Sequence, residues 1–275
     1  MIDQDQTARE IIPPTYSLSP EKVAEYTADL IDDPRTLEVP AKYQFAAIKV
    51  GSNEPQSNLA RHLERVVFER AFENDAALMT EAYRPYEPAS TFFIVLDRKN
   101  RQAAGALRVI RNSPAGFMSL NDVEDEEFGL DKDEVIAAHH VDDLDELLDI
   151  ATVAMLPEYR RQAGPVIRGY RAMFVWAQEH GIKHFVSMID EQPLEKMKQF
   201  FGIPFELMHG AKPAPYMGSK MTYPVYGYAP EFIPKMGQHM RTPSGLLAHR
   251  ALLTMVKGRD DVALVLGDRQ ERLSK

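Results

Sequence analysis

The chain has 275 residues, of which 44% are apolar and 27% are charged, so its composition is that of a globular protein. This length exceeds a typical domain of about 100–200 residues, so one core domain with extensions is expected. The absence of cysteine excludes disulfides, thiolate nucleophiles and cysteine-based metal sites, and a reducing cytoplasm is the expected location. No apolar stretch reaches the roughly 18–20 residues of a membrane span, and the first residues lack the pattern of a secretory signal.

The negative charge is concentrated in one segment of the chain. The formal net charge is −9, which disfavours a nucleic-acid partner, and residues 122–149 contain thirteen acidic residues against one lysine. The rest of the chain therefore carries a net charge of +3. Such a segment is either a solvated connection with a charged helix or a flap that attracts a cationic substrate, and both interpretations stay open.

The first half of the chain is predicted to be an N-terminal extension followed by the start of a core domain. In the extension, residues 1–42, Ser19 caps a helix that begins at Pro20 and ends near residue 31. The core domain then spans residues 43–229. Its first elements are a strand, an amphipathic helix capped by Asn58 and a hairpin of two strands, expected over 43–50, 58–72, 91–96 and 104–110.

The second half alternates strands and helices, which indicates an α/β arrangement. The apolar run LLDIATVAML is typical of a central strand, and a polar loop connects it to a helix that ends at Gly181. The expected elements are a strand at 147–156, a helix at 165–180, a strand at 182–189, a helix at 193–201, and strands at 204–208 and 221–228. Residues 230–275 form a C-terminal extension with a helix over 242–256.

The loop between the central strand and the following helix has the features of an anion site. Arg160, Arg161 and Gly164 lie at a helix N-terminus, where free backbone N–H groups and the helix dipole attract phosphate oxygens. The arginine side chains can add charge-assisted hydrogen bonds to a pyrophosphate. The sequence has neither a Walker loop nor the GxGxxG fingerprint of dinucleotide-binding proteins. An ordinary polar crossover loop is the alternative.

Residues 150–205 resemble the core of the GNAT superfamily of acyl-CoA-dependent N-acyltransferases. The family's loop, R/Q-x-x-G-x-G/A after a Pro-x-Tyr-Arg turn, is matched by Pro157, Tyr159, Arg160 and the run Arg161-Gln162-Ala163-Gly164-Pro165-Val166. Val166 replaces the final small residue, and Lys198 stands where many relatives keep a tyrosine acid. The resemblance implies a mixed twisted sheet flanked by helices on both faces. It also implies an acyl-CoA site formed by Met155, Arg160, Arg161, Gln162, Ala163, Gly164 and Val166.

A narrower resemblance extends upstream, to the acyl-homoserine-lactone synthases and the long-chain N-acyl amino acid synthases, a branch of the same superfamily. It covers about residues 58–228. The matching positions are Val67, Phe68, Glu81, Tyr83, Tyr86, Glu87, Ser90, Gly105 to Arg108, Gly210, Pro213, Gly218 and Ser219. Three positions depart from the branch's pattern: Glu87 replaces the usual aspartate, Arg84 stands at an acidic position, and Thr152 replaces a common arginine.

Amide formation from a thioester requires a neutral amine, a polarised carbonyl and a proton for the leaving thiolate. Glu87 and Glu81 are the candidate bases, and Tyr86 is a candidate acid. The resemblance implies that the backbone N–H near Met155 polarises the thioester carbonyl. Polar surface is the alternative role for the glutamates, and packing at the rim of the core is the alternative for the tyrosine.

Two further residues are candidates for contact with substrate. The acyl chain is expected to enter between the strands that end near Met155 and Ser187. Arg108 either orients a carboxylate of the acceptor or lies at an exposed strand end. No metal is expected, because the adjacent His139 and His140 lack a spaced set of ligands.

Together these features predict an N-acyltransferase that moves an acyl group from an acyl-CoA or acyl-carrier-protein thioester to a primary amine. The acceptor is expected to be amino acid-like or a small metabolite, and the narrower expectation is an enzyme similar to autoinducer or N-acyl amino acid synthases. One alternative is a non-catalytic ligand-binding or interaction protein with the same fold. The other is a small-acyl acetyltransferase. The sequence leaves the oligomeric state open.

Overall fold

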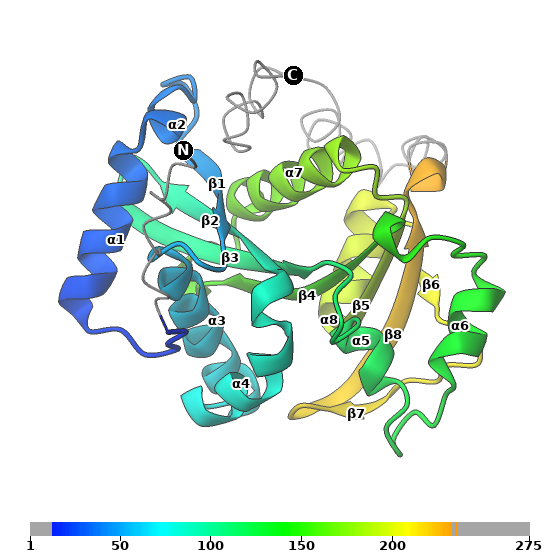
Figure 1. The fold of residues 1–275 in the computed structure, drawn as a ribbon. Coiled ribbons are helices and arrows are strands. Elements are labelled where there is room, and N and C mark those ends of the chain that lie inside the picture. Colours follow the sequence, from blue (N-terminus) through cyan, green and yellow to red (C-terminus); the bar gives the residue numbers. More distant parts are fainter. Residues whose placement is uncertain (1–12, 233–234, 236–275) are drawn as a thin grey trace, which may run out of the picture.

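The computed structural model describes residues 13–232 and residue 235. Its centre is a twisted eight-stranded sheet with helices on both faces (Figure 1). The helix expected over 242–256, and with it most of the C-terminal extension, lies outside the described residues. The expected domain boundaries at residues 42 and 229 stay predictions.

The strands lie in the order β1-β2-β3-β4-β5-β8-β6, with β7 paired on β8. Every pairing is antiparallel except that of β4 with β5, which are parallel and joined by the crossover helix α7 (Ala163–Glu179). The strands are β1 Phe45–Gly51, β2 Ser90–Asp97, β3 Gln102–Ile110, β4 Leu147–Met155, β5 His184–Asp190, β6 Glu206–Leu207, β7 Ala214–Tyr216 and β8 Ser219–Tyr228. This confirms the predicted mixed sheet flanked by helices.

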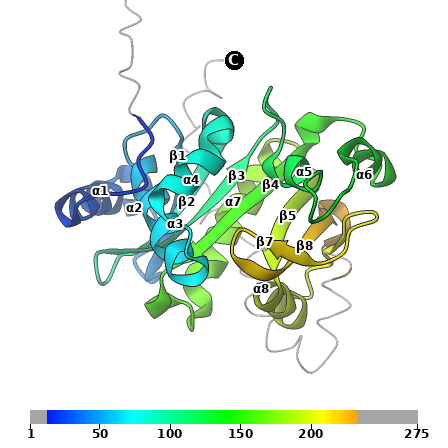
Figure 2. The ribbon, with the colours of Figure 1, turned by 90° about the horizontal axis from the view of Figure 1, so that it is seen from below.

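The alternation of side chains along β2 separates two cores. Phe92 and Ile94 pack on one face with side chains of α1 (Pro20–Asp32) and α3 (Ser57–Phe72), whereas Phe93 and Val95 pack on the other face beneath α7. Figures 1 and 2 show α3 and α7 on opposite faces of the sheet. Because both faces are covered, the central strands are buried at nearly every position and are mostly apolar.

The N-terminal segment packs onto this core. The side chain of Ser19 caps α1 as expected, accepting a hydrogen bond from the Lys22 N–H at 3.3 Å. Tyr16, Leu30 and Ile31 are buried. The other helical elements are α2 Pro34–Leu37, α4 Ala76–Tyr83, η1 Arg84–Ala89, α5 Met118–Asp122, α6 Lys132–Ala138, η2 Leu144–Glu146, η3 Pro157–Tyr159, α8 Glu191–Lys196 and η4 Met197–Phe201.

Three local predictions were wrong in detail. Helix α3 begins at Ser57, and the expected cap Asn58 instead accepts hydrogen bonds from the Thr15 N–H (3.0 Å) and from Arg61 (2.8 Å). The helix expected over 193–201 begins at Glu191 and changes to a π turn, and the strand expected over 204–208 is reduced to the two residues of β6. The contacts of Asn58 are with residues distant in the sequence, which hydrophobic periodicity does not report. The other two elements are too short to show a periodic pattern of apolar residues.

Candidate active site

Strands β4 and β5 begin side by side and then part. Among the described residues, their pairing runs from Leu147 opposite His184 to Asp149 opposite Val186 and extends no further. A bulge where β4 faces Arg108 and Val109 of β3 bends the strand at this point. We call the opening between residues 150–155 and 187–190 the fork, and Figure 2 shows the two strands diverging there.

Ser187 and Met155 lie at the two ends of the fork. Where the strands part, the Ser187 hydroxyl donates a hydrogen bond to the Ile150 carbonyl at 2.7 Å. At the open end, the Leu156 N–H donates to Ala104 of β3 at 3.0 Å. Backbone groups of successive strand residues point to opposite edges, so the N–H and C=O of Met155 face the fork. An N–H in this place is suited to polarise a carbonyl bound there.

The loop after β4 is fixed to the β2–β3 hairpin by Tyr159. This side chain is buried, and its hydroxyl lies 3.2 Å from both Asp97 and Gln102. Arg160 turns back, and its Nε donates to the Met155 carbonyl at 3.1 Å. Arg161 is exposed, as is the neighbouring Gln162. Both arginines are therefore exposed, and Arg160 is held against the end of β4 by its hydrogen bond.

Helix α7 begins directly after this loop, and no side chain caps its first turn. Pro165 has no N–H, so the backbone donors of the first turn come from Ala163 and Gly164. An uncapped N-terminus beside an arginine attracts anions. Val166 is half-buried against the core beneath α7. The assignment of these residues to an acyl-CoA site stays a prediction.

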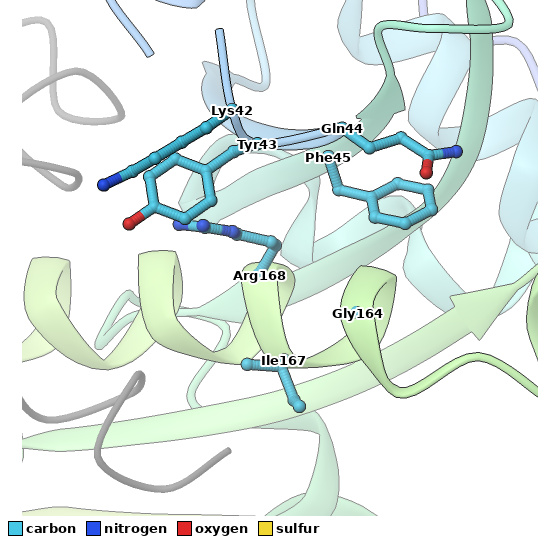
Figure 3. A pocket seen from close by; sticks show the side chains of 7 residues that line it. All are labelled: Lys42, Tyr43, Gln44, Phe45, Gly164, Ile167 and Arg168. Atoms are coloured by element: carbon cyan, nitrogen blue, oxygen red, sulfur yellow. The ribbon is translucent and has the colours of Figure 1, made fainter. Parts of the chain in front are cut away.

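Gly164 also meets a packing requirement. A Cβ at this position would lie 3.1 Å from the ring of Phe45, tighter than ordinary van der Waals contact. These two residues line one end of a hollow of about 280 Å³ between the start of β1 and α7 (Figure 3), together with Lys42, Tyr43, Gln44, Ile167 and Arg168. Because β1 is the edge strand beyond β2 and β3, this hollow lies on the flank of α7 away from the fork.

A closed network of charges is buried on the opposite face of β3 and β4. Arg108 is fully buried and binds Glu64 with two hydrogen bonds (3.1 and 2.7 Å), and it also donates to Glu87 at 3.2 Å. Arg61 donates to Glu87 at 3.0 and 2.5 Å. The hydroxyl of Tyr16 accepts from Arg108 at 2.6 Å and donates to Glu87 at 2.9 Å. Two guanidinium groups thus balance two carboxylates.

This network changes the interpretation of three predicted residues. Arg108 does not lie at an exposed strand end, since none of its surface is accessible. Burial alone would raise the pKa of Glu87, but the guanidinium groups of Arg108 and Arg61 hold it below its ordinary value, which makes the carboxylate a weak base. Glu81 lies outside the network: its side chain is 73% exposed and pairs with Arg84 on the surface.

Tyr86 lies on the side of this region that faces α5. It is buried, its hydroxyl accepts a hydrogen bond from Asn121 at 2.9 Å, and burial raises the pKa of the phenol. Tyr83 is buried beside it, against the Arg108 guanidinium, which lies 4.0 Å from its ring centroid. Protonated phenols of this kind can donate a proton but not accept one at neutral pH.

Asp149 is a functional candidate that the sequence-based reasoning missed. It is fully buried at the last residue pair before the fork, and it accepts hydrogen bonds from the N–H and the hydroxyl of Ser119, each at 2.7 Å. Burial raises the pKa of Asp149 to about 7, against the effect of the Ser119 hydrogen bonds. The signal in the sequence was a single carboxylate inside an apolar strand, because an aspartate is rarely fully buried without a partner or a functional role.

A second carboxyl group lies nearby, at the end of α5. Burial raises the pKa of Asp122 to about 6, although a hydrogen bond from the Tyr216 hydroxyl opposes the shift. The charge of Asp122 acts on Tyr83, Tyr86 and Asp149, which places all four groups in one region. Perturbed pKa values gathered in one region make these residues candidates for a functional site.

The rest of the acidic segment makes local contacts. Asp143 caps η2 by accepting from the Asp145 N–H, and Glu146 pairs with Lys183 at 2.6 Å. His139 stacks on Tyr226 with ring centroids 3.8 Å apart. Among the described residues, no group of three or more histidine, aspartate or glutamate side chains could hold a metal ion. No described helix is long and apolar enough to cross a membrane.

A mixed sheet whose two central parallel strands part, with the N-terminus of the crossover helix at the open end, defines the GNAT fold of N-acyltransferases. The chain has this fold. FeeM, an N-acyl amino acid synthase from uncultured soil microbes, matches it with a TM-score of 0.52 at 16% identity, over 71% of this chain and 98% of FeeM. This agreement confirms the predicted fold.

Two other solved structures show a looser likeness. BjaI, a CoA-dependent acyl-homoserine lactone synthase solved with SAM and isopentyl-CoA, has a TM-score of 0.41 at 13% identity over 76% of this chain and 99% of BjaI. Tetrahymena GCN5 has a TM-score of 0.39 at 9% identity, over 67% of this chain and 95% of GCN5. No protein-family profile matches the chain. No curated protein sequence matches it either.

Proposed function

We propose that the protein is an N-acyltransferase that transfers an acyl group from an acyl-CoA or acyl-carrier-protein thioester to a primary amine. The observation that carries this proposal is the fork, where an unpaired edge of β4 leads directly to the uncapped N-terminus of α7. A thioester in the fork would have its carbonyl near the Met155 N–H. Its phosphate groups would then meet the backbone of Ala163 and Gly164 and the Arg161 side chain.

The proton transfers of this reaction fit the groups at the inner end of the fork. Ionised Asp149 takes one proton from the acceptor's ammonium group, and the neutral nitrogen attacks the thioester carbon. The C–N bond forms and the C–S bond breaks. The leaving thiolate takes a proton from Tyr86, and the proton that the nitrogen loses on amide formation replaces it.

Glu87 fits a positioning role better than that of a base in this scheme. Its carboxylate receives hydrogen bonds from Arg61, Arg108 and Tyr16, so its lone pairs are occupied and its pKa is low. Held in this way, Glu87 fixes the side chain of Arg108, which lies on β3 opposite the bulge in β4. Glu81 is too exposed to share this role.

The test is binding and turnover with a series of acyl-CoAs of different chain lengths. Because the chain contains no cysteine, a thiol reagent reports released CoA without a protein background. We expect calorimetric binding of acyl-CoA and an amide product by mass spectrometry. Replacing Arg161 with Ala should weaken acyl-CoA binding about tenfold, the size expected for one charge-assisted hydrogen bond.

Arg70→Ala is the matched control, because Arg70 is an exposed arginine on α3, across the sheet from the loop. An equal loss of affinity in both variants would remove Arg161 from the site. Absence of binding by any acyl-CoA or acylated carrier protein, with no amide product, would overturn the proposed function. Binding without turnover would instead support the alternative of a non-catalytic ligand-binding protein.

A further inference from the structure

An amino acid acceptor carries a carboxylate, and a buried carboxylate needs a cation or several donors to replace its water. Two fully buried cations, Arg61 and Arg108, lie on the α3 side of β3 and β4, and both are already saturated with hydrogen bonds. Arg108 makes two hydrogen bonds to Glu64, one to Glu87 and one to the Tyr16 hydroxyl. Its guanidinium is covered by the rings of Tyr83 and Phe92, at 4.0 and 4.7 Å from their centroids.

Arg61 is occupied in the same way. It donates to Glu87, to the Ser57 hydroxyl at 2.6 Å and to the Asn58 amide oxygen at 2.8 Å. A substrate carboxylate could reach either guanidinium only by displacing a glutamate, which would leave that glutamate buried without a partner. Breaking a buried pair in this way is strongly unfavourable.

The other side chains near the inner end of the fork that are described above are neutral or acidic, apart from Lys132. Thr152 is the β4 residue opposite Arg108, and its hydroxyl donates a hydrogen bond to Glu64. The hydrogen bonds to Asp149 come from the neutral Ser119, and Asp122 is bonded by Tyr216. The cation beside Tyr86, Lys132, is paired with Glu124 at 2.6 Å. Arg61, Arg108 and Lys132 are thus each paired with a carboxylate, whereas the side-chain partners of Asp149 and Asp122 are neutral hydroxyl groups.

We infer that the acceptor is a primary amine that carries no carboxylate, rather than an amino acid, an inference that rests on the proposed acyl-transfer function. Its ammonium group would supply the positive charge that Asp149 lacks, in a region that also holds the buried rings of Tyr83 and Tyr86. An amino acid would place a second carboxylate beside Asp149 and Asp122, and like charges so placed repel strongly.

Matched pairs of acceptors test this inference on the unmodified protein. The pairs are tyramine with tyrosine and cadaverine with lysine, each supplied with the acyl-CoA that binds best, and tyrosine methyl ester serves as the neutralised form of the acid. We expect kcat/KM for the amine to exceed that for the amino acid by about 100-fold, with the ester close to the amine. Calorimetry without donor should detect tyramine and not tyrosine.

The outcomes separate this inference from the proposed function. Equal or better acylation of the amino acids overturns the acceptor class and leaves acyl transfer in place. Acylation of no panel member, with no binding of any acyl-CoA, overturns both.

A variant adds a second test. Replacing Glu64 with Gln keeps the shape of the side chain and frees part of the Arg108 charge, so tyrosine turnover should rise at least tenfold relative to tyramine turnover. Glu69→Gln, an exposed change on the same helix, is the control and should leave the ratio unchanged. An unchanged ratio in a folded Glu64→Gln protein would contradict the role assigned to the closed network. If the Glu64→Gln variant does not fold, the comparison of amine and amino acid acceptors on the unmodified protein tests the inference by itself.

Discussion

Asp149 and Glu87 are both buried carboxylates behind the same strands, yet their surroundings give them opposite proton affinities. Glu87 receives its hydrogen bonds from two guanidinium groups, which keep its pKa low. Asp149 receives its hydrogen bonds from neutral groups of Ser119 and from backbone, and burial raises its pKa to about 7. A carboxylate with a pKa near the working pH is the better base, so the two residues divide the roles of base and support.

Replacing Asp149 with Asn tests the first of these roles. Activity should fall by at least about 100-fold, the usual contribution of a general base. In the unmodified protein the rate should rise with pH up to about 7, because only the ionised carboxyl group accepts a proton. Asp142→Asn, an exposed change nearby, should alter neither the rate nor the pH profile. A rate that still rises through the same pH range in Asp149→Asn would assign the titration to another group.

The raised pKa also determines how stability depends on pH. The folded state binds the Asp149 proton more tightly than the unfolded state, whose carboxyl has a pKa near 3.8. The contribution of this residue to folding is therefore full below about pH 4 and is lost as the pH rises to about 7. Asp149→Asn should consequently raise the melting temperature at pH 8 relative to the unmodified protein. If the melting temperature falls by the same amount between pH 5 and pH 8 in the unmodified protein and in Asp149→Asn, the fall does not come from Asp149 and this prediction is wrong.

Glu87 and Glu81, the two bases proposed from the sequence, allow a comparison of how much a buried and an exposed glutamate stabilise the fold. Glu87→Gln should lower the free energy of unfolding by about 3 kcal/mol, because it leaves two buried guanidinium groups partly unpaired. Glu81→Gln should change it by less than about 1 kcal/mol, because that residue pairs with Arg84 in solvent. Urea unfolding followed by circular dichroism measures both. Similar losses in the two variants would refute the closed network.

At the scale of elements, the packing of Phe45 on Gly164 links strand β1 to the predicted phosphate loop. In a Phe45→Ala background, Gly164→Ala should stabilise the protein by up to about 1 kcal/mol, because alanine favours a helix. In the unmodified background the ring of Phe45 must move, so this gain should vanish or reverse. A double-mutant cycle of unfolding free energies measures the coupling. Acyl-CoA affinity that falls in both backgrounds would show a direct role of Gly164 at the phosphates.

The acidic segment divides into two parts with different roles. Asp122 and Asp149 face the region of Tyr86, whereas Asp143, Asp145 and Glu146 make caps and pairs at the closed end of the β4–β5 pair. Neutralising Asp142, Asp143, Asp145 and Glu146 should therefore leave the KM of a cationic acceptor unchanged at physiological salt, where exposed charges are screened, and also at low salt, because the contacts of these residues lie at the closed end of the strand pair. A higher acceptor KM that is largest at low salt would instead support steering by this segment.

Elements with a strong period were predictable from the sequence, and elements that depend on distant contacts were not. The strands β2, β3 and β4 and the helices α1, α3 and α7 follow from alternation, caps and apolar spacing. The short β7 and the π turn at the end of α8 have no such signal. The same limit applied to Arg108, whose partner Glu64 is 44 residues earlier in the chain. The sequence hint was that Arg61 and Glu64 lie on the apolar side of α3.

At the scale of the whole molecule, the charge pattern has a polarity that composition alone did not reveal. The loop with Arg160 and Arg161 lies at the open end of the fork, and the carboxyl groups of Asp149 and Asp122 lie at its closed end. A polyanionic donor and a cationic acceptor would thus be drawn to opposite ends of one opening. The sequence predicted the cationic loop, but folding had to bring the two carboxyl groups together.

The position of Tyr16 also has a consequence for the order of folding. Its hydroxyl bridges Arg108, 92 residues later in the chain, and Glu87, 71 residues later. During synthesis this tyrosine is therefore made well before Glu87 and Arg108, and these native contacts cannot form until both have been added. Contacts between such distant residues close slowly. We therefore expect the N-terminal segment to close over the charged network only after β3 has formed, because the Tyr16 hydroxyl bonds to Arg108 of that strand.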